Sequence, residues 1–119
     1  MKILVCEDDI VVLKVIQTAL EGEAVEVTSV KDGIRALEQL RENTFDLIIT
    51  DIHMPHHNGD EVLKLVRVDQ KKNTPIIMIS SDTEEELIAL AFKQGVNEFI
   101  KKPIDAITLR KKLKKFLAV

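Results

Sequence analysis

Five short apolar runs alternate along the chain with five segments in which apolar residues recur every three or four positions. Short runs that are rich in Ile and Val and bounded by turn residues are typical of β-strands. A spacing of three and four is typical of amphipathic helices. The apolar runs occupy residues 3–6, 25–28, 45–51, 75–80 and 98–102. The pattern therefore predicts five strands, each followed by a helix.

Each predicted helix has an apolar face and signals that mark where it starts or stops. Asp9 and Asp105 precede the first and last helices and are expected to cap them, and Gly95 is expected to end the fourth. The residues expected to face the core are Leu13, Ile16 and Leu20; Ile34, Leu37 and Leu40; Val62 and Val66; Leu87, Leu90 and Ala91; and Leu109, Leu113 and Phe116.

Repeated strand–helix units predict an α/β fold, with a parallel sheet covered by helices on both faces. The first, third and fourth runs are almost wholly apolar, as strands buried on both faces should be. The second and fifth runs alternate apolar with polar residues, which suits edge strands. The strand order 2-1-3-4-5 satisfies both observations and is that of flavodoxin-like folds. We therefore expect a (βα)5 flavodoxin-like three-layer sandwich.

Composition narrows the class of protein. A chain of 119 residues has the size of one domain, so we expect residues 1–119 to fold together. The net charge of −3 and the absence of Trp and Tyr argue against nucleic acid as a direct partner. Cys6 is the only cysteine, which favours a reducing, cytoplasmic compartment. No apolar stretch approaches the ~20 residues that cross a bilayer. Because Met1-Lys2 leads straight into the first apolar run, we expect no signal peptide.

Polar residues collect where the predicted strands end. Glu7 and Asp8 follow the first strand, Asp51 ends the third, Ser80 the fourth and Lys102 the fifth. Because the first and third strands are predicted neighbours, three carboxylates would share a small volume. Two charges ~5 Å apart repel by roughly 3 kcal/mol at an effective dielectric near 20. A cation would relieve this repulsion, and hard oxygen ligands suit Mg²⁺.

This arrangement suits phosphoryl transfer. A carboxylate can act as a nucleophile and form an acyl phosphate. The reaction needs mainly in-line positioning and neutralisation of charge on the phosphoryl oxygens. Mg²⁺ and Lys102 could supply that neutralisation, and the Ser80 hydroxyl could hydrogen-bond a phosphoryl oxygen.

With these residues in place, the whole chain resembles the receiver domain of two-component response regulators, of the single-domain CheY type. The resemblance rests on Glu7-Asp8, Asp51-x-x-Met54-Pro55-x-x-x-Gly59, Ser80 and Lys102-Pro103, in that order and spacing. It implies that Asp51 is the phosphoacceptor, that Lys102 contacts the phosphate, and that Ser80 is a switch hydroxyl coupled to Phe99. It also implies Mg²⁺ (or Mn²⁺) bound by Asp8, Asp51 and the backbone carbonyl of His53, with Glu7 acting largely through water.

The resemblance implies a function as a phosphorelay switch. A sensor histidine kinase or a histidine phosphotransfer protein would donate the phosphoryl group. The domain would catalyse only its own phosphorylation and autodephosphorylation, so it is not expected to be an enzyme with a separate substrate. The fourth helix, the strand at 98–102 and the last helix would form the face that controls a downstream target or an attached output domain. The chain would be a monomer or a phosphorylation-dependent dimer through that face.

Other readings stay open or are disfavoured by particular residues. A receiver-like binding module that never uses phosphate is the main alternative. A flavodoxin-like cofactor carrier is disfavoured because Glu7-Asp8-Asp9 would repel a bound phosphate. A phosphatase of the haloacid dehalogenase type is disfavoured as well. Such enzymes carry an Asp-x-Asp pattern after their first strand, whereas here Asp51-x-His53 follows the third predicted strand.

Two further groups of residues have simpler interpretations. The histidines 53, 56 and 57 are expected to be solvated rather than to bind a transition metal. Four lysines, Lys111, Lys112, Lys114 and Lys115, make the last helix basic. They form either a solvated face that complements the helix dipole or a docking face for an acidic partner.

Overall fold

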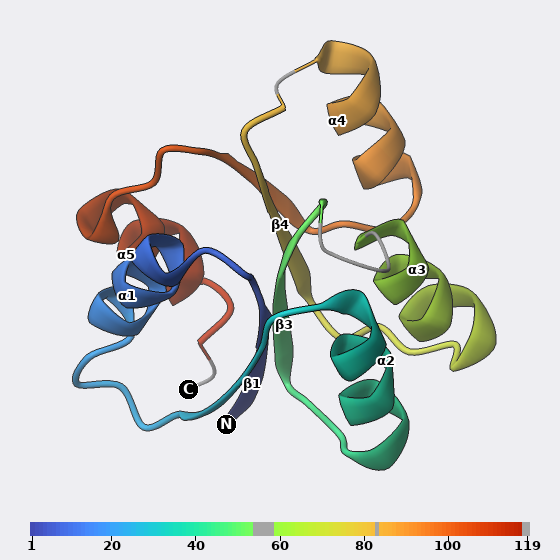
Figure 1. The fold of residues 1–119 in the computed structure, drawn as a ribbon, viewed down its shortest axis with the longest axis horizontal. Coiled ribbons are helices and arrows are strands. Elements are labelled where there is room, and N and C mark those ends of the chain that lie inside the picture. The colour runs from blue at the N-terminus through green and yellow to red at the C-terminus, as the bar shows by residue number, and fades with distance from the viewer. Residues whose placement is uncertain (54–58, 83, 118–119) are drawn as a thin grey trace.

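Five parallel strands form one sheet in the order β2-β1-β3-β4-β5 (Figure 1). The computed structural model describes residues 1–53, 59–82 and 84–117. The predicted strand order and the flavodoxin-like α/β fold are both confirmed. Every residue of β3 and β4 is buried, whereas most of the edge strand β2 is not. The strands are β1 (Lys2–Cys6), β2 (Glu26–Val30), β3 (Leu47–Asp51), β4 (Ile76–Ser80) and β5 (Glu98–Lys101).

Helices cover both faces of the sheet (Figure 1). They are α1 (Ile10–Ala19), α2 (Gly33–Glu42), α3 (Gly59–Lys64), α4 (Glu85–Lys93) and α5 (Ala106–Lys114). A π-helical turn, η1 (Leu65–Asp69), continues α3. One face packs against α1 and α5, and the other packs against α2 and α3. Among the described residues, no helix combines the length and apolar character that a membrane span requires.

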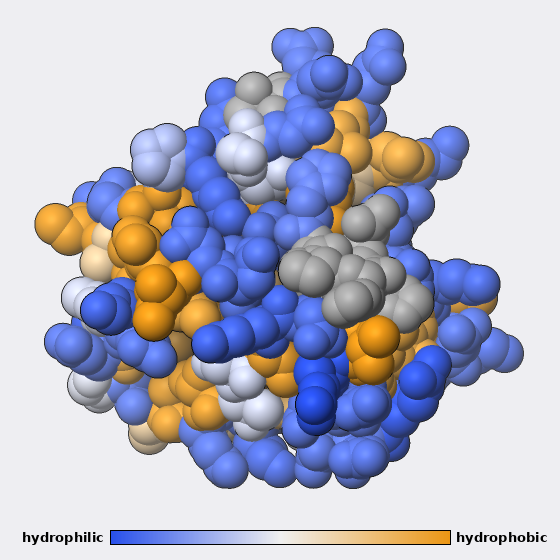
Figure 2. Space-filling model, viewed as in Figure 1, coloured by the Kyte–Doolittle hydropathy of each residue, from blue (hydrophilic) through white to orange (hydrophobic). Residues whose placement is uncertain are grey.

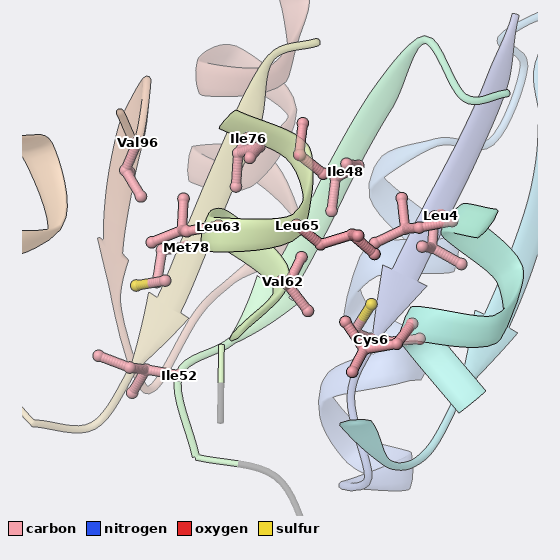
Figure 3. Close-up of a cluster of buried hydrophobic side chains, with 14 of the residues drawn as sticks. Leu4, Cys6, Ile48, Ile52, Val62, Leu63, Leu65, Ile76, Met78 and Val96 are labelled. Carbon is pink, nitrogen blue, oxygen red and sulfur yellow. The ribbon is translucent and has the colours of Figure 1, made fainter. Parts of the chain in front are cut away.

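Alternation along the strands divides the core into two layers, because successive side chains of a strand point to opposite faces. Ile3 and Val5 belong to the layer beneath α1 and α5. Leu4 belongs to the opposite layer, where it lines up with Ile48 and Ile76 from the neighbouring strands (Figure 3). Val62 of α3 closes over this second layer. The apolar strands predicted from sequence thus supply both sides of the core.

The predicted helix ends are largely confirmed. The Asp9 carboxylate accepts a hydrogen bond from the Val11 amide at 2.8 Å, and that of Asp105 accepts one from the Thr108 amide at 2.7 Å. Gly95 follows α4 with a φ of 106°, the left-handed region that favours glycine. The peptide bond between Lys102 and Pro103 is cis.

Three features of the helices differ from expectation. Ile34, in the first turn of α2, was expected to face the core but is 43% exposed. Leu90 was expected to face the core but is 48% exposed, because α4 stands away from the sheet and buries only Ala91 among its own residues (Figure 1). The π-helical turn was not predicted, since one extra residue in a turn leaves the apolar spacing almost unchanged. Five residues before α3 lie outside the described residues, namely Met54, Pro55, His56, His57 and Asn58.

Candidate functional site

Strand register brings the predicted residues to one edge of the sheet. Cys6 pairs with Thr50 in the β1–β3 ladder, so Glu7 and Asp51 come next to each other. Ser80 pairs with Lys101 in the β4–β5 ladder, so Lys102 follows directly beyond Ser80. All these strands are parallel, and therefore their carboxyl ends meet at the same edge, where ligands of open α/β sheets bind.

Three acids meet at this edge. Glu7, Asp8 and Asp51 each place a carboxylate oxygen within 4.8 Å of the others. Glu7 is 1% exposed and Asp51 6%, whereas Asp8 lies at the open side of the pocket. The Asp9 amide donates to Glu7 Oε1 at 3.1 Å, and the His53 amide donates to Asp51 Oδ1 at 3.2 Å. Backbone donors thus orient two of the three acids.

Lys102 places its ammonium beside two of the acids. Its Nζ lies 2.8 Å from Asp51 Oδ2 and 3.3 Å from both carboxylate oxygens of Glu7. Burial would lower the pKa of Lys102, but the hydrogen bond and charge of Asp51, and then those of Glu7, outweigh it and raise the pKa. One ammonium therefore faces three carboxylates, and the pocket keeps an excess of negative charge.

Glu7 carries the clearest sign that this pocket suits a cation. Its Oε2 atom is buried and accepts no hydrogen bond from the described residues, although the Lys102 ammonium lies 3.3 Å from it. Burial raises the pKa of the Glu7 carboxyl to about 7, and the negative charge of Asp51 contributes to the rise. The hydrogen bond from the Asp9 amide and the positive charge of Lys102 lower the pKa, but by less. Carboxylate oxygens are suitable ligands for a hard divalent ion such as Mg²⁺. Such an ion would also interact with the buried Glu7 oxygen that accepts no hydrogen bond.

The raised pKa of Glu7 predicts an unusual pH dependence of stability. A carboxyl that holds its proton more tightly when folded stabilises the protein most at low pH, and this contribution disappears as the pH rises through about 7. Without divalent ions, we expect the free energy of unfolding to fall by about 2 kcal/mol between about pH 5.5 and 8. Glu98 and Asp105 have lowered pKa values, so they stay ionised throughout this range.

Urea unfolding at several pH values measures this effect. Glu7→Gln, which keeps the shape of the side chain but cannot ionise, should remove most of the pH dependence. Stability that rises with pH in the wild type over this range, or an unaltered profile in Glu7→Gln, contradicts the assignment.

Ser80 and Phe99 lie behind the pocket. Ser80 is fully buried, and its hydroxyl oxygen accepts a hydrogen bond from the Asp82 amide at 3.0 Å. The Lys102 amide donates to the Ser80 carbonyl at 2.9 Å, but among the described residues the Ser80 hydroxyl makes no hydrogen bond to Asp51 or Lys102. Phe99 is 8% exposed and packs in the core layer on the α4 side of the sheet. The switch pair expected from the resemblance is therefore near the pocket but separate from its carboxylates.

Thr50 is a residue that the sequence interpretation missed. Its buried hydroxyl donates to the backbone carbonyl of Asp51 at 2.9 Å, so it helps to fix the chain at the pocket. A polar residue in an apolar run just before Asp51 was the signal available in the sequence.

A flavodoxin-like sheet with an acidic, lysine-bearing pocket at its carboxyl edge defines a class of receiver-like α/β domains. The chain belongs to the response regulator receiver domain family, whose sequence profile matches residues 3–114. Members of this family are signalling switches of two-component systems.

Similar proteins support this placement. Chemotaxis protein CheY-3 of Vibrio cholerae is 36% identical over 117 residues, which cover 97% of this chain and 90% of that protein. The structure of CheY4 from Vibrio cholerae superposes with a TM-score of 0.86 at 33% identity and covers 98% of both chains. The Francisella response regulator 1452 receiver domain gives a TM-score of 0.86 at 30% identity, covering 98% of this chain and 95% of that one.

Longer regulators also contain such a domain. The two-component response regulator ORR22 of Oryza sativa is 38% identical over 112 residues, which are 92% of this chain but 16% of that protein. The matched unit thus occurs both in proteins of about this size and as a small part of larger ones.

Proposed function

We propose that residues 1–119 form one receiver domain that accepts a phosphoryl group on Asp51 from a sensor histidine kinase or a histidine phosphotransfer protein. The observation that carries this proposal is the buried Asp51 carboxylate, which contacts Lys102 at 2.8 Å and shares its pocket with Glu7 and Asp8. An Asp51 carboxylate oxygen attacks phosphorus and forms the acyl phosphate bond. The bond from phosphorus to the donor histidine nitrogen breaks, and its electron pair stays on the imidazole.

The residues of the pocket divide the work of this transfer. Glu7, Asp8, Asp51 and the backbone carbonyl of His53 would hold Mg²⁺ (or Mn²⁺), which, when bound, neutralises charge on the phosphoryl oxygens. Lys102 donates to a phosphoryl oxygen and stabilises the product, so its side chain exchanges part of its contact with Asp51 for the phosphate. The phosphoryl group ends on the domain's own Asp51, so the domain modifies itself rather than converting other molecules as an enzyme does.

Ser80 links the phosphate to the output face. Its hydroxyl hydrogen is available for a phosphoryl oxygen, and its oxygen holds the Asp82 amide just before α4. We propose that phosphorylation changes this contact and, with Phe99, remodels the face built by α4, β5 and α5. A phosphate shifts such an equilibrium only by its difference in affinity for the two states. The face would control a downstream protein or an attached output domain, in a monomer or in a dimer formed through it.

Labelling with acetyl phosphate tests this proposal against the alternative of a binding module that never uses phosphate. In the presence of Mg²⁺, we expect the wild-type protein to gain the mass of one phosphoryl group, in a form that hydroxylamine removes. A protein that gains no such group under these conditions would favour the phosphate-independent module. The predicted cytoplasmic location stays a prediction.

An apolar surface beside the pocket is a candidate for docking the protein donor. Apolar atoms gather over α1 and α5 (Figure 2), where Ile10 is 61% exposed, Val11 65% and Ile107 72%. A hollow of about 350 Å³ is lined by Val11 and reaches Lys102. A donor that presents a phosphohistidine to Asp51 must approach this edge, so it would cover these side chains.

Placing a charge on this surface should slow phosphoryl transfer from a protein donor but not from a small-molecule donor. We expect Val11→Glu to slow transfer from a phosphorylated histidine phosphotransfer protein at least about tenfold, because the new carboxylate would be desolvated on docking. Labelling by acetyl phosphate should be unaffected. The matched control is Ile34→Glu, which charges an exposed apolar residue on α2, across the sheet from α1. Equal slowing by both variants, or in both assays, contradicts the docking surface.

A further inference from the structure

Helix α4 is weakly attached at its amino-terminal end. The Asp82 amide donates to the Ser80 hydroxyl at 3.0 Å, and the Glu84 amide donates to Asp82 Oδ1 at 3.2 Å. The side chain of the N-cap residue Glu84 makes no capping hydrogen bond. Along the helix itself only Ala91 is fully buried, and Leu87 and Ile88 are partly buried against the same core layer. In Figure 1, α4 projects beyond the sheet instead of lying along it.

The carboxyl-terminal end of α4 is fastened by Arg67 of η1. Arg67 Nε and Nη2 donate to the carbonyl of Gly95 at 3.1 and 2.9 Å. Nη2 also donates to Asn97 Oδ1 at 3.0 Å, and Nη1 donates to the Lys72 carbonyl at 2.9 Å. All three guanidinium nitrogens are therefore engaged, and we call this group of contacts the Arg67 clamp.

The clamp joins three segments at the end of the sheet opposite the acidic pocket. Asn97 Oδ1 also accepts from the Ile76 amide at 2.9 Å, which connects the clamp to the first residue of β4. A Cβ atom at Gly95 would lie 2.8 Å from Arg67 Nε, so the side chain packs directly on the glycine backbone. The end of α4, the start of β5 and the start of β4 are thereby held as one body.

We propose that Arg67 is a positioning residue of the switch, which fixes the carboxyl-terminal end of α4 so that the helix turns about Gly95 when the hydrogen bond between Ser80 and Asp82, just before the helix, changes. This inference rests on the proposed function, because it takes Ser80 as the point where phosphorylation reaches α4. A helix of nine residues is about 13 Å long, so a fixed end turns a small change at the other end into a rotation.

The clamp also determines whether the rotated helix presents a defined surface. Leu90 and Phe92 are 48% and 45% exposed, so the orientation of α4 sets where these apolar side chains lie. Without the clamp, both ends of the helix would be loosely held and many orientations would be populated. Phosphorylation would then change the population of one orientation only slightly.

Fluorine NMR can observe the phosphate site and the helix in one sample. Ala89 is exposed on α4, and Ala89→Cys accepts a trifluoromethyl tag. Cys6 would stay unlabelled, because it is fully buried and burial raises the pKa of its thiol to about 12. Beryllofluoride, a mimic of the aspartyl phosphate, gives its own fluorine signals when it is bound with Mg²⁺.

We expect beryllofluoride to shift the tag signal in the Ala89→Cys background. Adding Arg67→Ala should leave the bound beryllofluoride signals in place but reduce the shift of the tag at least twofold, with a broadened line. Arg67→Lys keeps a positive charge but loses the fork of donors, so it should give a reduced shift as well. If Arg67→Ala does not fold, the shift of the tag in Arg67→Lys tests the clamp instead.

The matched control is Gln70→Ala, at the residue after η1. Gln70 Nε2 donates to the Leu40 carbonyl at 3.0 Å, so this change removes a hydrogen bond to α2 rather than to α4. It should leave the shift of the tag unchanged. A full tag shift in the Arg67 variants, or an equal loss in Gln70→Ala, overturns the clamp. Absence of bound beryllofluoride signals in the background protein would instead reject the proposed function, and the clamp with it.

Discussion

Asp51→Asn should abolish phosphorylation of this protein by acetyl phosphate, to below about 1% of the wild-type rate. The asparagine amide has the same shape but no nucleophilic carboxylate oxygen. The variant should still fold, because it loses the 2.8 Å ion pair with Lys102 but also the repulsion from Glu7 and Asp8. We therefore expect its melting temperature to stay within a few degrees of the wild-type value. Mass spectrometry of the intact protein measures the phosphoryl group directly.

Asp9→Asn is the matched control for this experiment. Asp9 is an acid at the same edge of the sheet, but its carboxylate caps α1. Asparagine is also a good cap, so this variant should be labelled like the wild type. Undiminished labelling of Asp51→Asn would reject Asp51 as the acceptor. Loss of labelling in both variants would point to a general effect of charge at this edge.

Mg²⁺ should stabilise the unphosphorylated protein. With a dissociation constant near 1 mM, an assumed value, about 10 mM Mg²⁺ would add about 1.4 kcal/mol to the free energy of unfolding. That corresponds to a rise of about 4–6 °C in the melting temperature of a domain of this size. The physical reason is the excess of negative charge around Glu7, Asp8 and Asp51, which Lys102 offsets only in part. Calorimetry with and without EDTA measures the shift.

Asp8→Asn and Asp9→Asn separate this effect from general screening of charge. The first removes a carboxylate of the pocket and should lose most of the shift caused by Mg²⁺. The second removes an acid outside the group of three and should keep the shift. The shift should also be larger at about pH 8 than at about pH 6, because Glu7 has a pKa of about 7 and binds a proton at the lower pH. Equal shifts in all three proteins would contradict a specific site.

Local patterns were sufficient to predict most of the fold. The apolar runs gave the five strands, and the contrast between wholly apolar and alternating runs gave the edges of the sheet. Asp9 and Asp105 were recognisable as caps because capping depends on residues a few positions apart. The prediction that Leu90 faces the core was wrong, since this residue is 48% exposed. A helical spacing identifies an apolar face, but it does not say how far the helix stands from the sheet.

The residues of the candidate site could be collected from sequence because they follow the ends of strands whose order was predictable. The electrostatic interactions among these residues could not be predicted from the sequence. The missing hydrogen bond at Oε2 of Glu7 and the ion pairs of Lys102 with two acids depend on side-chain directions that only packing fixes. The Arg67 clamp gave no sequence signal beyond Gly95, since its acceptors are mainly backbone carbonyls, which every residue carries.

The sequence by itself determined the order of the elements, the edge of the sheet where the acids gather and the family to which the chain belongs. It could do so because strand and helix periods, caps and motif spacing are local properties. Only the tertiary structure decided which buried carboxylate oxygen accepts no hydrogen bond, how firmly each end of α4 is held and which apolar side chains stay exposed. These features depend on distances of a few ångströms between residues far apart in the chain, which no local pattern specifies.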